Sequence, residues 1–486
     1  MRLSRISLAA VPLLLMVLIA LGVSCSSGDT QQAMRQVVPD SMVLRPRLPD
    51  TLKVGVLYSP TGYFLFRGDT LGYDYERVTD FAADHGIALK FEVAESMKQL
   101  LTLIDDDKVD LLAVEIPETA EYKEHVINCG APNITYQVLV QPAGGKVITD
   151  VTQLVGRDVY VIQGSQYEAR LKNLDSEIGG GINIRPIDND TIIAENLIDM
   201  VASGKLPMTV VDSDIAQFGA TYYEDGVIDI SLKVSFAQRS SWGVAKEDRW
   251  LADTINAWAE SDRAREFSKE AKRRYFELNK SMTDTAKYEL KEGDISPYDS
   301  LFNAYARKAH CDWMLLAAIC KVESGFDNER TSWAGAKGIM QVMPRTAKAF
   351  GYDAADLNDP EKCIDAAAQV LSGLDESLRS RVPNVKERQH FILAAYNCGL
   401  GHIVDAMALA KKYGYNPQVW YGNVEEMALW KSRPEYYNDP VCKFGYFRAR
   451  ETVGYVKKVE ESYEEYLAQA KKEAQKHKNS RHRHKR

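Results

Sequence analysis

One glutamate in this chain stands where a carboxyl group could work as an acid. Glu323 lies near the end of an apolar run, is followed by Ser324 and Gly325, and precedes a Gly-rich polar stretch that begins at Ser332. Apolar surroundings raise the pKa of a carboxyl group, because burial disfavours its ionised form. Such a group can protonate a leaving oxygen near neutral pH. The plain alternative is a surface glutamate near a helix end, and Glu323 by itself does not exclude it.

The element that must position Glu323 is a helix. Asp312 is a suitable N-cap, and Gly325 is a natural C-terminal stop. Four apolar residues recur between them at helical spacing, namely Leu315, Leu316, Ile319 and Val322. Glu323 then falls in the last turn, where the negative end of the helix dipole adds to the effect of the apolar neighbours and raises its pKa further.

Four motifs surround and follow this glutamate. They are 323–326 (Glu-Ser-Gly-Phe), 335–347 (Gly-Ala-Lys-Gly-Ile-Met-Gln-Val-Met-Pro-Arg-Thr-Ala), 394–399 (Ala-Ala-Tyr-Asn-Cys-Gly) and 451–456 (Glu-Thr-Val-Gly-Tyr-Val). In content and order they resemble the Slt-type lytic transglycosylase domain. The resemblance implies a mainly α, goose-lysozyme-like fold that cuts the MurNAc–GlcNAc β-1,4 bond of peptidoglycan.

The same resemblance implies roles for individual residues. Glu323 is expected to be the catalytic acid and base, and Glu451 an internal hydrogen-bonding residue rather than a second catalyst. The expected substrate-binding residues are Ser324, Ser332, Met340, Gln341, Tyr396, Asn397 and Tyr455. No metal and no cofactor is expected.

A single catalytic carboxyl group predicts an unusual product. Most glycosidases place two carboxylates beside the bond that they cut. With one, Glu323 first protonates the leaving oxygen, and its carboxylate then takes a proton from the MurNAc C6 hydroxyl. Attack of that hydroxyl on C1 forms 1,6-anhydro-MurNAc without water. Two alternatives stay open: a hydrolytic, lysozyme-like muramidase, and a non-catalytic receptor that binds cell wall or solute.

The region before this domain, residues 51–276, has the alternating pattern of an α/β fold. We expect strands at 52–57, 88–93, 109–114, 159–162 and 208–212, helices at 73–85 and 97–103, and a helix that begins at 164–168. The pattern predicts largely parallel sheets in two lobes, joined near residues 138–145. A ligand cleft is expected between the lobes.

This region resembles the periplasmic solute-binding proteins of family 3, which capture amino acids. The resemblance rests on the opening strand, the helix start at 72–76 (Gly-Tyr-Asp-Tyr-Glu) and Asp212, which the family uses to hold a ligand's amino group. Its binders follow a Thr-x-Glu turn with arginine, whereas Tyr122 follows Glu121 here, and tyrosine cannot form a bidentate ion pair with a carboxylate. A muropeptide, an amino-acid-like ligand and an empty structural lobe all remain open.

The N-terminus predicts export. Arg2 and Arg5 precede an apolar run at about 6–21, and small residues lead to Cys25. This resembles a lipoprotein signal over residues 1–24, with a membrane anchor on lipidated Cys25; a cleaved signal or an uncleaved anchor is the alternative. We expect a location in the bacterial cell envelope, facing the periplasm and anchored in the outer membrane. The combination of export signal, binding region and Slt-type motifs resembles the membrane-bound lytic murein transglycosylase F family.

Length and composition agree with several folded parts. The chain has 486 residues, enough for two or three domains, and its net charge of -8 argues against nucleic-acid binding across the chain. We expect a tether at 25–50, a linker at 277–297, the Slt-type domain at 298–470 and a basic tail at 471–486. The tail is interpreted as a disordered extension or as a contact with an anionic polymer or membrane. Six cysteines besides Cys25 allow free thiols or one or two disulfides.

Overall fold

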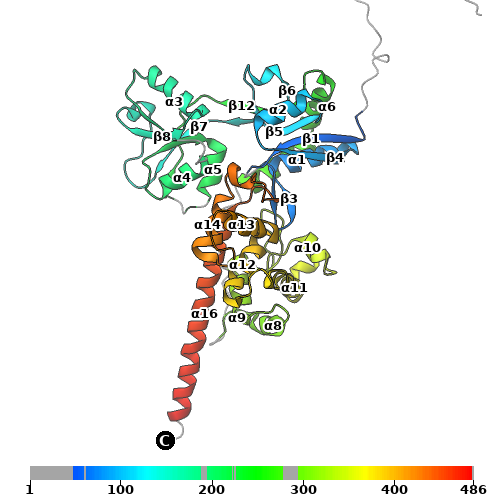
Figure 1. Ribbon diagram of the computed structural model, residues 1–486, viewed down its shortest axis with the longest axis vertical. Helices are drawn as coiled ribbons and strands as arrows, with labels where there is room; N and C mark the ends of the chain where they lie inside the picture. The colour runs from blue at the N-terminus through cyan, green and yellow to red at the C-terminus, as the bar shows by residue number, and fades with distance from the viewer. Residues whose placement is uncertain are drawn as a thin grey trace, which may run out of the picture. The chain divides into compact units, whose positions relative to one another are not determined.

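The computed structural model describes residues 48–59, 62–187, 194–221, 223, 226–276 and 294–483, with side chains as far as residue 475 (Figure 1). The predicted signal peptide, Cys25 and most of the linker predicted at 277–297 lie outside the described residues. Among the residues that are described, no helix is both long and apolar enough to cross a bilayer.

The first lobe is built on a five-stranded sheet with the order β4-β1-β5-β12-β6. Its strands are β1 (Thr51–Leu57), β4 (Ala88–Ala94), β5 (Leu111–Pro117), β6 (Val126–Thr135) and β12 (Gln238–Ala245). Strand β1 pairs in parallel with β4 and β5, and β12 returns antiparallel to β5 and β6. Its helices are α1 (Tyr73–His85), α2 (Met97–Asp105), α6 (Arg249–Ala259) and α7 (Asp262–Phe276). The sheet is therefore mixed, with a parallel core.

The second lobe carries a sheet with the order β11-β7-β10-β8-β9. Its strands are β7 (Gln137–Pro142), β8 (Asp158–Ile162), β9 (Asn183–Ile187), β10 (Thr209–Asp212) and β11 (Ile228–Asp229), and its helices are α3 (Gln166–Glu177), α4 (Ala194–Ala202) and α5 (Ser213–Ala220). The predicted lobe junction at 138–145 was wrong. Most of that run forms β7, whose apolar residues are buried, and the chain passes between the sheets at Tyr136.

A small hairpin interrupts the first lobe between β1 and α1. Its strands are β2 (Phe64–Phe66) and β3 (Asp69–Leu71), which pair antiparallel. The two turn residues, Arg67 and Gly68, have φ of 50° and 84°. Positive φ at both central positions is typical of a type I′ hairpin turn, where Asn, Asp or Gly is preferred, so Arg67 is an unusual residue for its backbone conformation.

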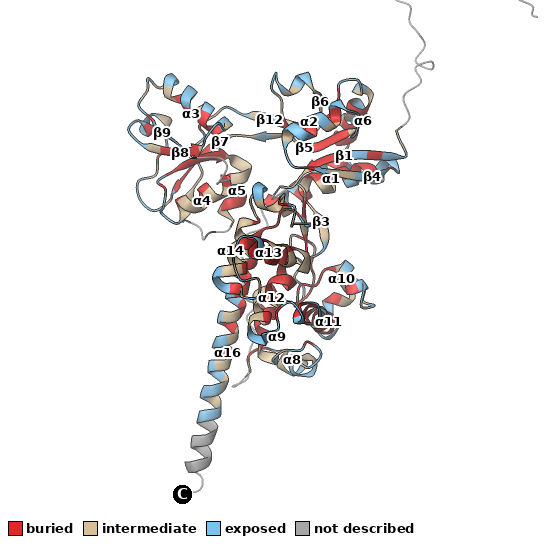
Figure 2. Ribbon diagram, in the orientation of Figure 1, coloured by how far each residue is buried: buried red, intermediate tan, exposed pale blue. Residues whose placement is uncertain are grey.

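The C-terminal region is helical, as predicted. Its longer helices are α8 (Asp299–Tyr305), α9 (Trp313–Ser324), α11 (Pro360–Arg379), α12 (Val385–Cys398), α13 (Leu400–Lys412) and α16 (Ala449–Arg483), and its short ones are α10 (Pro344–Lys348), α14 (Glu425–Trp430) and α15 (Pro434–Tyr437). They enclose one large apolar core, to which α9, α11 and α12 contribute many buried residues (Figure 2). Apart from isolated bridges near residues 331–342, the described part of this region has no β-structure.

Helix α16 extends farther toward the C-terminus than the sequence predicted. It runs through residue 470, where the sequence placed the domain end, and continues to Arg483. Its first part packs against α9 and α12, and its later part extends beyond the other helices of the domain (Figure 1). Most of the predicted basic tail is therefore helical, rather than a disordered extension.

The six described cysteines are all free thiols, which resolves the alternatives left by the sequence. They are Cys129, Cys311, Cys320, Cys363, Cys398 and Cys442, and four of them are buried. Burial raises the pKa of the Cys129 and Cys398 thiols to about 12, so both are protonated at neutral pH. These two cysteines behave as small apolar core residues.

Candidate active site

Glu323 lies in the last turn of α9, as its sequence predicts. Asp312 caps the helix by accepting a hydrogen bond from the Met314 backbone N–H, and Gly325 ends it with φ of 64°. The glutamate side chain is only 7% exposed. Burial raises the pKa of the Glu323 carboxyl group above its usual range, while the charge of Arg67 acts in the opposite direction. The direction agrees with the one expected from the apolar sequence around it.

The Gly-rich segment after α9 forms a compact loop that is fastened to the helix. The Ser324 hydroxyl donates to the carbonyl of Ile339 at 2.7 Å, and the Ser332 hydroxyl accepts from the backbone N–H of Ala336 at 3.0 Å. Gly338 has φ of 73°, and a Cβ atom there would lie 2.0 Å from the Leu357 carbonyl oxygen. Glycine is therefore required at this position, and the two serines hold the loop rather than point into open space.

Met340 and Gln341 make their contacts outside this loop through their carbonyl groups, which accept from Tyr396 and from Arg67 respectively. Met340 is fully buried in the core, and its carbonyl accepts from the Tyr396 hydroxyl at 2.8 Å. Gln341 is also buried, with φ of 50°, and its side-chain amide donates to the carbonyls of Arg330 and Gly338. In this conformation their side chains stabilise the loop, and direct sugar contacts by these side chains stay a prediction.

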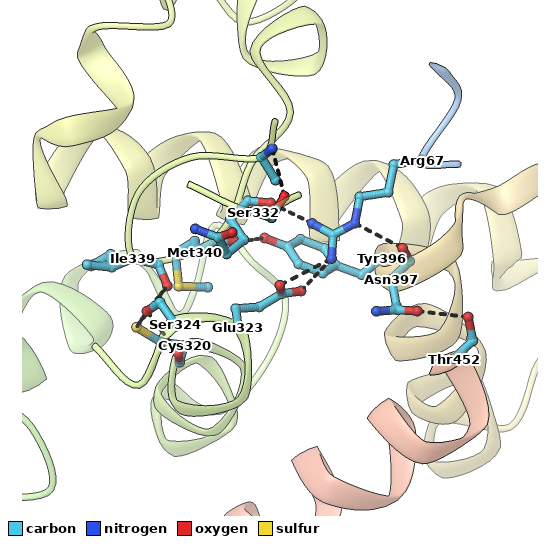
Figure 3. Close-up of polar contacts among 12 residues, drawn as sticks. Arg67, Cys320, Glu323, Ser324, Ser332, Ile339, Met340, Tyr396, Asn397 and Thr452 are labelled. Carbon is cyan, nitrogen blue, oxygen red and sulfur yellow. Dashed lines mark hydrogen bonds and ion pairs between the residues drawn. The ribbon is translucent and has the colours of Figure 1, made fainter. Parts of the chain in front are cut away.

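Helices α12 and α16 supply the remaining motif residues. Tyr396 and Asn397 lie at the end of α12, and Thr452 at the start of α16 donates from its hydroxyl to Asn397 Oδ1 at 2.8 Å. Tyr455 is 6% exposed, and burial and the charge of Glu323 raise the pKa of its phenol. The four sequence motifs are thus brought together around one carboxyl group (Figure 3).

A residue from the first lobe completes the arrangement. Arg67, at the tip of the β2–β3 hairpin, donates from Nη2 to Glu323 Oε1 at 2.8 Å and to Oε2 at 3.1 Å. Its Nη1 donates to the Gln341 carbonyl at 2.5 Å, and its Nε to the Asn397 carbonyl at 2.9 Å. The guanidinium also lies over the ring of Tyr396, 5.6 Å from its centroid. Figure 3 shows it directed at the glutamate.

Arg67 and Thr452 are the two residues that sequence reasoning missed. Thr452 lies inside the fourth motif, so its membership of that motif could have indicated that it belongs to the site. The run 64–71 (Phe-Leu-Phe-Arg-Gly-Asp-Thr-Leu) has the alternation and central glycine of a hairpin, but nothing in it indicates which surface the tip would contact.

Asp212 lies in a different setting, at the N-terminal boundary of α5 in the second lobe. Its Oδ2 accepts from the Tyr167 hydroxyl at 3.0 Å and from Gln166 Nε2 at 2.9 Å. Its Oδ1 is buried and makes no hydrogen bond within the described residues. Burial, together with the nearby charge of Asp214, raises the pKa of Asp212 to about 6. A carboxylate oxygen without a donor can receive an ammonium group.

The described residues contain no group of three or more His, Cys, Asp or Glu side chains arranged to hold a metal ion. Glu323 is neutralised by an arginine of the same chain, and Asp212 is held by neutral donors.

Comparisons with known proteins identify the family of the C-terminal domain and relatives of the whole chain. Residues 300–419 match the family described as "Transglycosylase SLT domain". The chain is 30% identical over 436 residues to membrane-bound lytic murein transglycosylase F of Aeromonas salmonicida, covering 88% of this chain and 84% of that protein. It is 29% identical over 430 residues to the protein of the same name from Pseudomonas fluorescens, covering 87% and 86%.

Solved structures similar to the chain are binding proteins. An ancestral arginine-binding protein bound to arginine is 21% identical, with a TM-score of 0.38, covering 47% of this chain and 99% of that one. A probable amino-acid ABC transporter extracellular-binding protein from Bacillus subtilis is 17% identical, with a TM-score of 0.41, covering 46% and 97%.

Proposed function

The chain belongs to the membrane-bound lytic murein transglycosylase F family, and on this premise we propose that Glu323 is its catalytic acid and base. The enzyme is a peptidoglycan lytic transglycosylase, and the product we expect from the MurNAc–GlcNAc β-1,4 bond is 1,6-anhydro-MurNAc. The observation that carries the residue assignment is the convergence of the Slt-type motif segments on one buried carboxyl group whose pKa is raised.

In the proposed reaction the protonated Glu323 gives its proton to the glycosidic oxygen as the C1–O bond breaks. The substrate's own N-acetyl group stabilises the positive charge that develops at C1. The Glu323 carboxylate then removes the proton from the MurNAc C6 hydroxyl, whose oxygen bonds to C1. The carboxyl group ends the cycle protonated, so one residue serves as acid and then as base.

The other motif residues are proposed to shape the sugar site. Tyr396, Asn397 and Tyr455 lie around the carboxyl group, and Ser324 and Ser332 hold the loop that carries Met340 and Gln341. Under the hydrolytic alternative, Glu451 would be the second carboxylate. Its charge acts on Glu323, and its buried Oε2 makes no hydrogen bond within the described residues. A hydrolase would need such a second carboxylate to activate water.

Product analysis tests the assignment. Purified peptidoglycan is treated with the full chain, with Glu323→Gln and with the control Glu465→Gln. Glu465 is an exposed glutamate of α16 that pairs with Lys321 of α9, the helix that also carries Glu323. We expect anhydro-muropeptides from the wild type and from the control, and none from Glu323→Gln, by mass spectrometry. Reducing-end MurNAc as the product, lost in Glu451→Gln, would favour the hydrolase. Equal digestion by wild type and Glu323→Gln would remove Glu323 from the mechanism.

We also propose that the two-lobed region binds a muropeptide or amino-acid-like ligand and modulates cleavage. Support comes from Asp212, whose Oδ1 is left for an ammonium group, and from the contact of the first lobe with Glu323 through Arg67. Calorimetry with muropeptides from digested peptidoglycan, on wild type and Asp212→Asn, tests it. Binding that is unchanged in the variant excludes the role of Asp212.

The proposed location is the outer membrane, with the chain facing the periplasm and anchored by lipid on Cys25. The support is the sequence pattern of residues 1–25 and the family's membrane-bound members. Cys25→Ala should move the protein from the membrane to the soluble fraction, and mass spectrometry of the N-terminal peptide should find the acyl groups in the wild type. A Cys25→Ala protein that stays in the membrane would contradict lipid anchoring.

A further inference from the structure

The last part of helix α16, residues 471–483, extends away from the core of the catalytic domain. Among the side chains described, which reach residue 475, Tyr466 is the last buried one of this helix, and Lys471 and Lys472 are exposed. The helix continues to Arg483, about 25 Å beyond Tyr466 at 1.5 Å per residue. Figure 1 shows this part projecting past the other helices of the domain. We call residues 471–483 the basic end of α16.

The basic end concentrates positive charge on a chain that is acidic overall. It contains four lysines and two arginines, and Glu473 is its single acid. The chain as a whole has a net charge of -8, so its other residues carry an excess of negative charge. The negative end of the helix dipole favours cations in the last turn only, which accounts for Arg481 and Arg483 but not for the four lysines. A separated block of one charge is typical of a segment that contacts a partner of the opposite charge.

These cations oppose the helix that carries them. Lys472 and Lys476 are four residues apart, and Lys478 and Arg481 are three apart, spacings at which like charges on a helix repel each other. Short helical segments depend on tertiary packing for most of their stability, and the residues just beyond Tyr466 are largely exposed. A polyanion that neutralises the cations would therefore stabilise this part of α16.

Composition distinguishes a polymer from a membrane as that polyanion. A helix that lies on a membrane buries an apolar face built from residues such as Trp, Phe and Leu. Residues 471–483 contain none of these, and Ala474 is their one apolar residue. Peptidoglycan has no apolar interior, and the carboxyl groups of its peptide stems make it a polyanion. A helix with dense positive charge and no apolar face therefore suits peptidoglycan better than a lipid surface.

The same helix joins the basic end to the catalytic site. Near its start, Thr452 donates to Asn397, and the charge of Glu323 acts on the phenol of Tyr455. Lys471 follows Tyr455 by about 24 Å along the helix axis. A small substrate cannot span this distance. A polymer can be held at the basic end while one of its glycosidic bonds lies at Glu323.

We propose that the basic end of α16 is a second contact with peptidoglycan, which holds the polymer beside the catalytic domain through the carboxylates of its peptide stems. The inference rests on the proposed function, because its partner is the polymer that Glu323 is proposed to cleave. The contact is electrostatic and is shared by several cations, so salt screens it and no single lysine decides it.

Sedimentation with purified sacculi tests the contact. Every protein is the full chain with Glu323→Gln and Cys25→Ala, so that neither cleavage nor a lipid anchor contributes, and this protein is the parent. The test variant changes the six lysines and arginines of the basic end to glutamine, which has a similar helix propensity. The matched control makes the same change at four lysines and two arginines of the two-lobed region, each more than half exposed, namely Lys90, Lys108, Lys172, Arg185, Lys269 and Arg273.

The two variants lose equal charge, so only its position differs between them. At about 50 mM salt the six-glutamine variant should bind sacculi at least about tenfold more weakly than the parent, and the control should bind within about twofold of the parent. At about 500 mM salt, where screening acts over about 4 Å, parent binding should fall toward that of the six-glutamine variant. Sacculi whose carboxylates have been converted to neutral amides should no longer distinguish the two proteins.

Turnover separates this contact from a merely structural role of the helix. With Glu323 restored, the six-glutamine variant should cleave a soluble tetrasaccharide–peptide fragment, which is too short to reach from Glu323 to the basic end, within about twofold of the wild-type rate. From dilute sacculi it should release anhydro-muropeptides at least about fivefold more slowly. A helix end that only supports the fold would slow both reactions equally, which would contradict the proposal.

Three further results would overturn the proposal. They are equal binding of the six-glutamine variant and the control to sacculi, a difference between parent and variant that persists on amidated sacculi, and a difference seen with phosphatidylglycerol vesicles but not with sacculi. The last would assign the basic end to a membrane. A chain that ends at Gln475 is a second variant with the same expected loss of binding. Absence of anhydro product from every protein would defeat the proposed function, and sedimentation would still decide the contact.

Discussion

Glu323 and Asp212 are both carboxyl groups at the boundary of a helix, one in the catalytic domain and one in the second lobe. Glu323 is buried and Asp212 is half-buried, and burial raises the pKa of both. Their partners differ. Glu323 is met by the guanidinium of Arg67, whereas Asp212 is met by a phenol and an amide and keeps one oxygen without a donor. The first site holds a cation of its own chain, whereas the second has only neutral donors, and an ammonium ligand there is our proposal.

This difference shows that two similar acids can be held by partners of different charge. A buried carboxylate needs either a counter-charge or enough donors to stay ionised. For Glu323 this counter-charge comes from Arg67 of the same chain. Neutral donors orient the carboxylate of Asp212 without balancing its charge, which is why we propose that a ligand's ammonium group binds there.

The largest expected difference between the Glu323 and Asp212 sites is in the effect of their substitution on turnover. Glu323→Gln should lower the rate of anhydro-muropeptide release at least about a thousandfold, because the same group donates and later accepts the proton. Asp212→Asn should change the rate without ligand by less than about threefold. Rates from reverse-phase separation of the products decide this, and comparable losses in both variants would put Asp212 into the reaction itself.

The next largest difference is expected in the energetic coupling of each carboxylate to its partner. In a double-mutant cycle, Glu323→Gln with Arg67→Ala should show a coupling of about 2–3 kcal/mol in unfolding free energy, because each single change leaves a buried group unpaired. The cycle of Asp212→Asn with Tyr167→Phe should give about 1 kcal/mol. Urea unfolding followed by fluorescence measures both, and equal couplings would remove the distinction between charged and neutral partners.

The pH dependence of ligand binding sharpens the description of Asp212. Its pKa of about 6 means that it is ionised at pH 7.5 and loses its charge below pH 6. Muropeptide affinity should therefore be level above pH 7 and fall by up to about tenfold per pH unit below 6. Calorimetry at pH 7.5 and 5.0 measures it, with Asp212→Asn as the control that should lack this step. An affinity that rises as the pH falls would exclude an ammonium on Asp212.

The smallest expected effect is on stability. A carboxyl group whose pKa is raised in the folded state destabilises the fold when it is ionised, and this cost is lost as the pH falls from the folded-state pKa of about 6 to the unfolded-state value of 3.8. Asp212→Asn should therefore raise the free energy of unfolding by about 1–3 kcal/mol at pH 7.5 and by almost nothing at pH 3.5. Urea unfolding at the two pH values tests the sign, and a destabilised variant at pH 7.5 would show that the ionised Asp212 is already well solvated.

Much of the fold and of the catalytic constellation could be predicted from local pattern. Helix α1 begins and ends at Tyr73 and His85 as expected, and the predicted strands 52–57 and 159–162 lie within β1 and β8. The apolar spacing before Glu323, with Asp312 and Gly325 as its stops, predicts α9 because capping and helical periodicity are properties of neighbouring residues. The lobe junction was misplaced because a buried strand and an apolar connection look alike in one sequence.

By itself, the sequence determined that one glutamate lies at the end of an apolar helix and that a two-lobed region precedes it, and it predicted that four motif segments meet around this glutamate. Only the tertiary structure decided what touches that glutamate. Arg67 lies 256 residues before Glu323, and its ion pair exists because a hairpin of one domain docks on another domain. Contacts of this kind depend on how finished surfaces fit together, and no local pattern of charge or hydrophobicity encodes them.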